Sequence, residues 1–261
     1  MDLGLKNKNA LVLGAGGGLG GAIAQRLHEA GARVALAGRS AESLQDRARR
    51  ISPDGDRLMT LVWDLADLES IDNNVRLVEE SLGHVDILVN NTGGPPPTPV
   101  RAQEIETWTS YFQSMVLSVI AITDRVLPNM VANQWGRVIT SVSSGVIAPI
   151  PNLGLSNALR STLVGWSKTL AREVGREGVT SNLIVPGRIA TDRIVYLDQA
   201  KAEREGRSVE SVTAESTATI ALGRYGDPEE YANVAAFLAS EAASYVTGST
   251  IRVDGGLIPS V

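Results

Sequence analysis

The chain has 261 residues, of which 43% are apolar and 20% charged, enough for one large α/β domain but short for two. Its net charge of −5 gives no reason to expect nucleic acid or an anionic membrane as a partner. Cysteine is absent, which excludes disulfides, thiol catalysis and thiolate metal sites. The only histidines, His28 and His84, fall in amphipathic patterns, so neither a zinc site nor a histidine-based triad is expected.

Targeting signals are not evident either. The start, MDLGLKNKNALVLG, lacks the apolar segment of a signal peptide and runs directly into an expected strand. No apolar run of about 18 residues is uninterrupted, so the sequence predicts no membrane span. We therefore expect a cytoplasmic protein that acts on a small molecule.

Short apolar runs alternate with longer helical patterns from the first strand onward. Each run is bounded by Gly, Pro or polar residues and is typical of a buried strand. The runs cover residues 10–14, 33–38, 58–64, 85–90, 136–143, 179–186 and 249–256, and the helical patterns cover 19–31, 41–51, 67–82, 104–132 and 153–177. This alternation predicts a single α/β domain over residues 1–261, a Rossmann-type, doubly wound parallel sheet of about seven strands with helices on both faces.

Residues 188–226 interrupt the alternation. This segment is long, helical in composition and mixed in charge, and it separates the sixth strand from the next helix. Ligands of doubly wound sheets bind beyond the carboxyl ends of the strands, and the insertion leaves such an end. It therefore predicts a substrate lid, the alternative being a solvated helical pair with no binding role.

A glycine-rich loop, LGAGGGLG at residues 13–20, follows the first strand and opens the first helix. Glycines let the backbone turn tightly and approach a pyrophosphate, and the amides of the helix N-terminus face its negative charge. A tight turn alone would not need five glycines in seven positions. The residues expected to contact the dinucleotide are Gly14, Gly16, Gly17, Gly18, Leu19 and Gly20.

Two further positions concern the adenosine end of the dinucleotide. The second strand ends in Gly38 and Arg39, where an acidic residue would bind both ribose hydroxyls of NAD. An arginine suits a 2′-phosphate, so NADP is favoured over NAD, unless Arg39 is merely an exposed residue at a helix start. Asp64, at the end of the third strand, is expected to accept from the adenine amino group, or else to belong to the cap of the 67–82 helix.

These motifs together resemble those of the short-chain dehydrogenase/reductases over essentially the whole chain. The glycine loop resembles their TGxxxGxG, with Leu13 in place of Thr, and Asp64-Leu65 resembles their adenine-binding pair. NNTG (90–93) resembles NNAG, PGRIAT (186–191) resembles PG-x-x-x-T, and residues 222–256 are very similar to the tail of ketoacyl-carrier-protein reductases. The resemblance implies further cofactor contacts from Leu65, Asn91, Thr92, Gly93, Arg160, Pro186, Gly187, Ile189 and Thr191.

The family's catalytic set is Asn, Ser, Tyr and Lys, and the resemblance implies that three of these positions have changed. Ser143 stands at the serine that positions the carbonyl, but Ser156 stands at the tyrosine that acts as acid and base. Arg160 replaces the lysine that holds the nicotinamide ribose, and Met115 replaces the asparagine that holds a relay water. The loop at 91–99 and the segment PNLGLSNALRS at 151–161 also resemble an atypical ketoacyl-reductase-like subgroup without a complete catalytic set.

These replacements remove the usual proton route. A serine hydroxyl is a far weaker acid than a phenol, and it is too short to reach where the phenol would lie. Methionine cannot hold a water by hydrogen bonding, whereas Arg160 can still bind a ribose hydroxyl as a permanent cation. Tyr111, one turn from Met115, and Tyr196, in the expected lid, are the alternative acids.

Three functions remain open on this sequence. The first is an NADP-dependent, 3-oxoacyl-reductase-like oxidoreductase that acts on a carbonyl or alcohol with a non-standard active site. The others are a nucleotide-binding protein with little redox activity and a lyase or epimerase that uses the same pocket. The resemblance also implies a homotetramer or homodimer paired through the helices at 104–132 and 153–177 and through the last strand. Consecutive apolar residues such as Met115, Val116, Leu117 and Ile120 favour this pairing.

Overall fold

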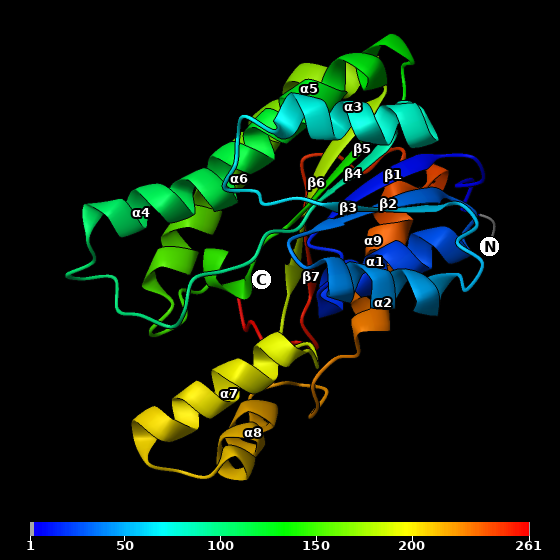
Figure 1. Cartoon of the computed structure of the whole chain (residues 1–261). Coiled ribbons are helices and arrows are strands. Elements are labelled where there is room, and N and C mark those ends of the chain that lie inside the picture. Colours follow the sequence, from blue (N-terminus) through cyan, green and yellow to red (C-terminus); the bar gives the residue numbers. More distant parts are fainter. Residues whose placement is uncertain (1–2, 261) are drawn as a thin grey trace.

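The computed structural model describes residues 3–260, which form one parallel sheet flanked by helices (Figure 1). The strand order is β3-β2-β1-β4-β5-β6-β7, and every neighbouring pair is parallel. The strands are β1 (Asn9–Leu13), β2 (Arg33–Gly38), β3 (Leu58–Val62), β4 (Ile87–Asn90), β5 (Gly136–Ser141), β6 (Val179–Pro186) and β7 (Thr250–Val253). The winding reverses between β1 and β4, which confirms the predicted doubly wound Rossmann-type fold.

Helices cover both faces of the sheet because alternate strand side chains point to opposite sides. Val12 packs toward α1 (Gly18–Glu29), α2 (Ala41–Ile51) and α9 (Pro228–Ala239). Leu11 and Leu13 pack instead toward α3 (Ile71–Leu82), α5 (Ser118–Ala132) and α6 (Gly154–Val174). Two apolar layers therefore hold the sheet from both sides, as continuous apolar strand sequences require.

Helix starts differ in a way that matters for the site. The Ser40 hydroxyl accepts from the Ser43 amide to cap α2, and Ser208 caps α8 (Val209–Ala218) in the same way. Helix α9 has a reciprocal capping box between Asp227 and Glu230. Helix α1 begins after Gly17 with no side-chain cap, so its first amides are left facing outward at the carboxyl end of β1.

The third strand corrects one expectation. The sequence pattern at 58–64 predicts a strand buried on both faces, but β3 ends at Val62 and forms one edge of the sheet. Its residues are half-buried or exposed, and the Val62 side chain is 57% exposed. An edge strand is covered less completely than a central one, and its sequence does not reveal that position.

The long apolar pattern at 104–132 forms three consecutive segments. Helix α4 (Ile105–Phe112) passes through one π-helical turn at Gln113–Leu117 into α5. Tyr111, Ser114 and Met115 line the site cavity at this turn, whose wider spacing changes the side-chain direction.

The sequence predicts no membrane span, but by length and composition alone Ile105–Ala132 could cross a membrane. In the structure, 44% of its most apolar 18-residue window is buried. Core helices of soluble proteins meet the same criterion, so it is weak evidence for a span.

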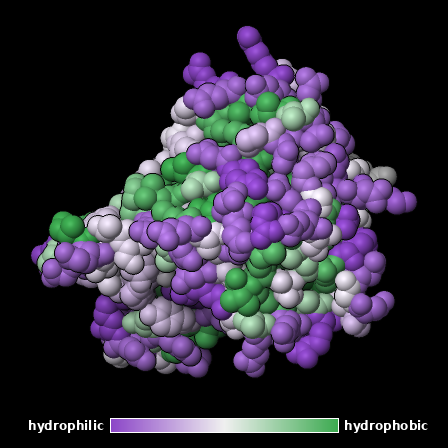
Figure 2. Space-filling model, turned by 45° about the horizontal axis from the view of Figure 1, so that its top comes forward, coloured by the Kyte–Doolittle hydropathy of each residue, from purple (hydrophilic) through white to green (hydrophobic). Residues whose placement is uncertain are grey.

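Apolar side chains remain exposed around α4. Val100 is 58% exposed and Ile105 71%, and Figure 2 shows apolar surface at the projecting end of the molecule where α4 lies in Figure 1. Met115 and Val116, in contrast, are buried within the single chain and need no partner to cover them. Self-association through these helices stays a prediction. The exposed apolar side chains around α4 support it, because such surface is typical of an interface between protein chains.

The segment 188–226 folds as two helices, α7 (Asp192–Glu205) and α8 (Val209–Ala218), which project beyond the carboxyl ends of the strands (Figure 1). Arg188 pairs with Asp198 at 2.6 Å, and the Tyr225 hydroxyl donates to the same carboxylate at 2.7 Å. Lys201 and Glu215 join the two helices at 3.1 Å. These ion pairs and the hydrogen bond hold the two helices together, so that they can move as one unit. The role of the two helices as a lid stays a prediction.

Candidate active site

A cavity of about 1130 Å³ lies beyond the carboxyl ends of the strands, between the sheet and α7–α8. The structure brings together in its lining every cofactor and catalytic position that the sequence analysis singles out. These residues are Gly14, Gly16, Gly17, Gly18, Leu19, Gly20, Arg39, Asp64, Leu65, Asn91, Thr92, Gly93, Met115, Ser143, Ser156, Arg160, Pro186, Gly187, Ile189 and Thr191. They come from segments as far apart as β1 and the end of β6, so their convergence is a property of the fold.

The glycine loop is packed against its surroundings too closely for side chains. Gly14 has φ +62°, and a Cβ there would lie 2.6 Å from the Asn91 main-chain oxygen. A Cβ on Gly20 would lie 2.4 Å from the Gly14 oxygen, and one on Gly18 would lie 2.5 Å from Thr191. At Gly17 the nearest atom would be 3.5 Å away, so packing does not demand glycine there.

The loop and the first turn of α1 fit a dinucleotide diphosphate. Helix α1 has no side-chain cap and no acidic residue in its first turn, so its amides present a partial positive charge to the cavity. The open side of Gly17 lets a ligand approach this backbone, and Thr191 borders the same turn. These residues would hold the diphosphate of NADP or NAD.

At the adenosine end, Arg39 is exposed, and among the described residues it makes no ion pair. The Asp64 Oδ1 accepts from the Ala66 amide at 3.0 Å, which shapes a turn after β3. Helix α3 begins only at Ile71, so Asp64 does not cap it, and that alternative is wrong. Asp64 lines the cavity, and its Oδ2 accepts no hydrogen bond from the described residues.

The three catalytic positions other than Arg160 line the cavity without forming a relay. The Ser143 hydroxyl accepts from the Gly145 amide at 3.2 Å and begins a short 3₁₀ turn after β5. Ser156 lies in the first turns of α6 and is 6% exposed, and Met115, in the π-helical turn, is 2% exposed. Neither histidine lines the cavity, so no imidazole base faces Ser156.

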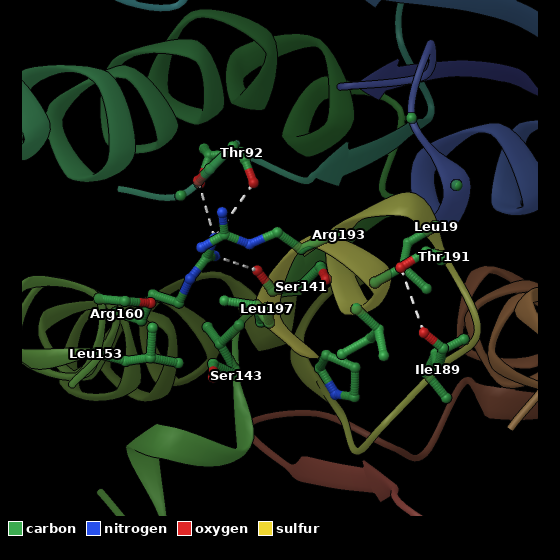
Figure 3. A pocket seen from close by; sticks show the side chains of 18 of the residues that line it. Leu19, Thr92, Ser141, Ser143, Leu153, Arg160, Ile189, Thr191, Arg193 and Leu197 are labelled. Atoms are coloured by element: carbon green, nitrogen blue, oxygen red, sulfur yellow. Dashed lines mark hydrogen bonds between the residues drawn. The ribbon is translucent and has the colours of Figure 1, made fainter. Parts of the chain in front are cut away.

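Arg160 is buried, with 9% of its surface exposed, and is fixed by main-chain oxygens. Its guanidinium donates to Ser141 at 3.2 Å, to Thr92 at 3.2 Å and to Gly93 at 2.9 Å (Figure 3). Burial lowers the pKa of Arg160 to about 10, with a smaller contribution from the charge of Arg193. Arg160 is therefore a cation at neutral pH, held across the ends of β4 and β5.

The sequence analysis missed Arg193, which reaches into the cavity from α7. Its guanidinium donates to the Pro95 main-chain oxygen at 2.7 Å and lies 5.5 Å from the centre of the Tyr196 ring. Burial of the guanidinium lowers the pKa of Arg193, opposed by nearby Tyr196 and Tyr111. The only sequence signal was a basic residue two positions after Thr191 in the expected lid.

The tyrosines near the site differ in access. Tyr111 lines the cavity, whereas Tyr196 does not and instead lies beside Arg193. Tyr231 is fully buried; its hydroxyl bonds the Ser141 hydroxyl at 2.8 Å and donates to the Ile184 oxygen at 3.2 Å. Burial raises the pKa of Tyr231, so it is a structural residue, and Tyr111 is the one tyrosine of the described residues that lines the cavity.

Known proteins are similar to this chain both in sequence and in architecture. Residues 14–258 match the family described as enoyl-(acyl carrier protein) reductase. The 3-oxoacyl-(acyl-carrier-protein) reductase FabG of Salmonella typhimurium is 35% identical over 254 residues, which cover 97% of this chain and 98% of that protein.

Solved structures of reductases have the same fold as this chain. The L-sorbose reductase of Gluconobacter frateurii, complexed with NADPH and L-sorbose, has a TM-score of 0.93 at 30% identity, with both chains fully covered. YwfH, an NADPH-dependent reductase involved in bacilysin biosynthesis, has a TM-score of 0.92 at 28% identity and covers 97% of this chain and 99% of its own. The chain belongs to the short-chain dehydrogenase/reductase family of NAD(P)-dependent oxidoreductases and is similar, within it, to the 3-oxoacyl-(acyl-carrier-protein) reductases.

Proposed function

We propose that this protein is an NADP-dependent oxidoreductase that interconverts a carbonyl and an alcohol in a non-standard active site. The observation that carries the proposal is the uncapped first turn of α1, which borders one cavity with Arg39, Ser143 and Arg160. Two similar solved proteins are described with NADPH, in agreement with an arginine at the 2′-phosphate position.

The chain's own residues have separate roles in this proposal. The cofactor supplies or accepts the hydride, and hydride transfer needs only that cofactor and substrate be held in contact. Ser143 donates a hydrogen bond to the substrate oxygen, and Arg160 holds the nicotinamide ribose as a fixed cation. Met115 keeps water from its part of the cavity, and Ser156 fills space without acting as an acid. Tyr111 is the candidate proton donor because it is the accessible phenol.

The test is a titration of the purified protein with NADPH and NADH, followed by NADPH oxidation with a panel of ketones and oxo acids. NADPH binding at micromolar concentration together with oxidation by one carbonyl class supports the proposal. Absence of NADPH binding overturns it.

A second candidate, a nucleotide-binding protein with little redox activity, is favoured by Ser156 and Met115 at two catalytic positions. Tight NADPH binding without turnover on any substrate of the panel would identify it.

We also propose a homodimer or homotetramer, because Val100 and Ile105 leave apolar surface around α4. Light scattering at micromolar concentration that gives the 27.6 kDa mass of one chain contradicts that assembly.

A further inference from the structure

We propose that Arg193, with the positive charge of Arg160 beside it, binds a carboxylate of the substrate, so that the carbonyl compound is an oxo acid and the alcohol a hydroxy acid. This inference rests on the proposed function for the reacting carbonyl, but the anion site itself follows from the two arginines and their surroundings.

The two guanidinium groups border one small volume. A Cβ placed on Gly94 would lie 3.5 Å from Nη2 of Arg193 and 3.7 Å from Nη2 of Arg160. Figure 3 shows the two side chains, one from α6 and one from α7, meeting beside Thr92. Two cations this close repel one another, and an anion between them would remove the repulsion.

Neither arginine has a carboxylate partner among the described residues. Arg160 donates only to main-chain oxygens, and Arg193 donates only to Pro95. Every other arginine of the segment 188–226 is paired with an acid: Arg188 with Asp198, Arg204 with Glu205, Arg207 with Glu215 and Arg224 with Glu230. Arg193, the exception, is the one whose guanidinium meets Arg160. Asp192, which precedes Arg193 and also lines the cavity, forms no ion pair with either arginine among the described residues.

Hydrogen-bonding groups are left without partners on Thr92 and Arg193, two residues that line the cavity here. The Thr92 side chain is 8% exposed, and its buried hydroxyl has no partner. Nη2 of Arg160, the nitrogen that borders this volume, already donates to the Thr92 and Gly93 oxygens, so Arg160 contributes mainly its charge. Arg193 makes one hydrogen bond, to Pro95, and keeps donors for a ligand. A carboxylate accepts several hydrogen bonds in such a fork, and guanidinium groups bind it more strongly than a neutral oxygen.

The position favours a substrate carboxylate over the cofactor diphosphate. The diphosphate is expected at the first turn of α1, beside Leu19 and Thr191. In Figure 3 those two residues lie apart from the arginine pair, which is on the same side as Ser141 and Ser143. Since Ser143 is the residue proposed to hold the reacting oxygen, an anion at the arginines would belong to the same molecule. It would also join α7 to the fixed body of the protein.

Binding measurements on acid and ester pairs test the site directly. The full-length protein, saturated with NADP⁺, is titrated calorimetrically with 2-oxohexanoate, 4-oxohexanoate and their methyl esters. We expect at least one acid to bind tenfold or more tightly than its ester. Arg193→Gln, which keeps length and a donor but removes charge, should abolish that preference, whereas ester binding and the NADPH dissociation constant stay within twofold. Arg193→Lys should retain most of the preference.

Arg207→Ala is the matched control, because it removes an ion-paired arginine near the α7–α8 turn that does not line the cavity. It should leave the acid preference unchanged; an equal loss in both variants would show that α7–α8 packing alone is responsible and would overturn the proposal. So would a wild-type protein that does not prefer acids. If Arg193→Gln weakens NADPH tenfold and affects acid and ester alike, the anion is the diphosphate. Acid preference without NADPH oxidation would leave the anion site standing and remove the redox function.

Discussion

The main-chain oxygen of Ser141 accepts a hydrogen bond from the buried guanidinium of Arg160 at 3.2 Å. The Ser141 hydroxyl is bonded to Tyr231 on the other side, at 2.8 Å. Through Thr92 and Gly93 the same guanidinium also holds the segment that follows β4. Arg160 therefore joins the carboxyl ends of two strands, a structural task that comes in addition to any contact with a cofactor.

Replacement of Arg160 by alanine is expected to lower the free energy of unfolding by about 3 kcal/mol, because three main-chain acceptors lose charged donors. It should also weaken cofactor binding. Arg160→Lys should recover part of the stability but not all, since one ammonium cannot match the fork of three contacts. Urea unfolding followed by circular dichroism measures both variants, and a loss below about 1 kcal/mol for the alanine variant would contradict this account.

Arg39→Ala should weaken NADPH much more than NADH. The variant loses a charge-assisted contact to the 2′-phosphate of NADPH, which costs about 1.5–3 kcal/mol of binding free energy. NADH has no 2′-phosphate, so its binding does not depend on this contact. Fluorescence titration of both cofactors gives the comparison. Arg49→Ala, which changes an exposed arginine of α2 that does not line the cavity, is the control. Equal weakening of both cofactors, or a wild-type preference for NADH, would exclude the proposed role of Arg39.

Ser156→Ala should change any measured turnover by less than tenfold, or under about 1.4 kcal/mol in the barrier. The serine is buried at the cavity wall. Among the described lining residues, no histidine or carboxylate forms a hydrogen bond with Ser156 and could act as its base. Steady-state kinetics with the best substrate of the panel measures the effect. A loss of a hundredfold or more at unchanged cofactor affinity would identify Ser156 as catalytic.

Gly20→Ala should destabilise the protein by more than about 2 kcal/mol, because its Cβ would lie 2.4 Å from the Gly14 oxygen, a main-chain atom that cannot move aside. Gly165→Ala is a matched control in the exposed face of α6, where nothing lies within 4 Å of the added Cβ. It should raise stability by about 0.5–1 kcal/mol through lower chain entropy in the unfolded state. Thermal unfolding of both variants measures the change in stability, which we expect to be negative for Gly20→Ala and positive for Gly165→Ala.

The sequence by itself predicted the parallel sheet, because short apolar strands that alternate with amphipathic helices are patterns of neighbouring residues, and this alternation is typical of parallel pairing. The five glycines and the following helix pattern likewise predicted a diphosphate site at the first turn of α1, since such a site is built from consecutive backbone groups. The extent of the α7–α8 segment followed from its break in the strand–helix rhythm.

Tertiary structure alone decided the rest. It decided that β3 lies at an edge and that Tyr111, and not Tyr196, borders the cavity. It also decided that Arg193, 33 positions after Arg160 in the chain, meets that residue beside Gly94. Such meetings depend on how α7 docks over the strand ends, which is set by packing and ion pairs between distant segments. No local pattern records them, because each arginine taken alone is an ordinary helix residue.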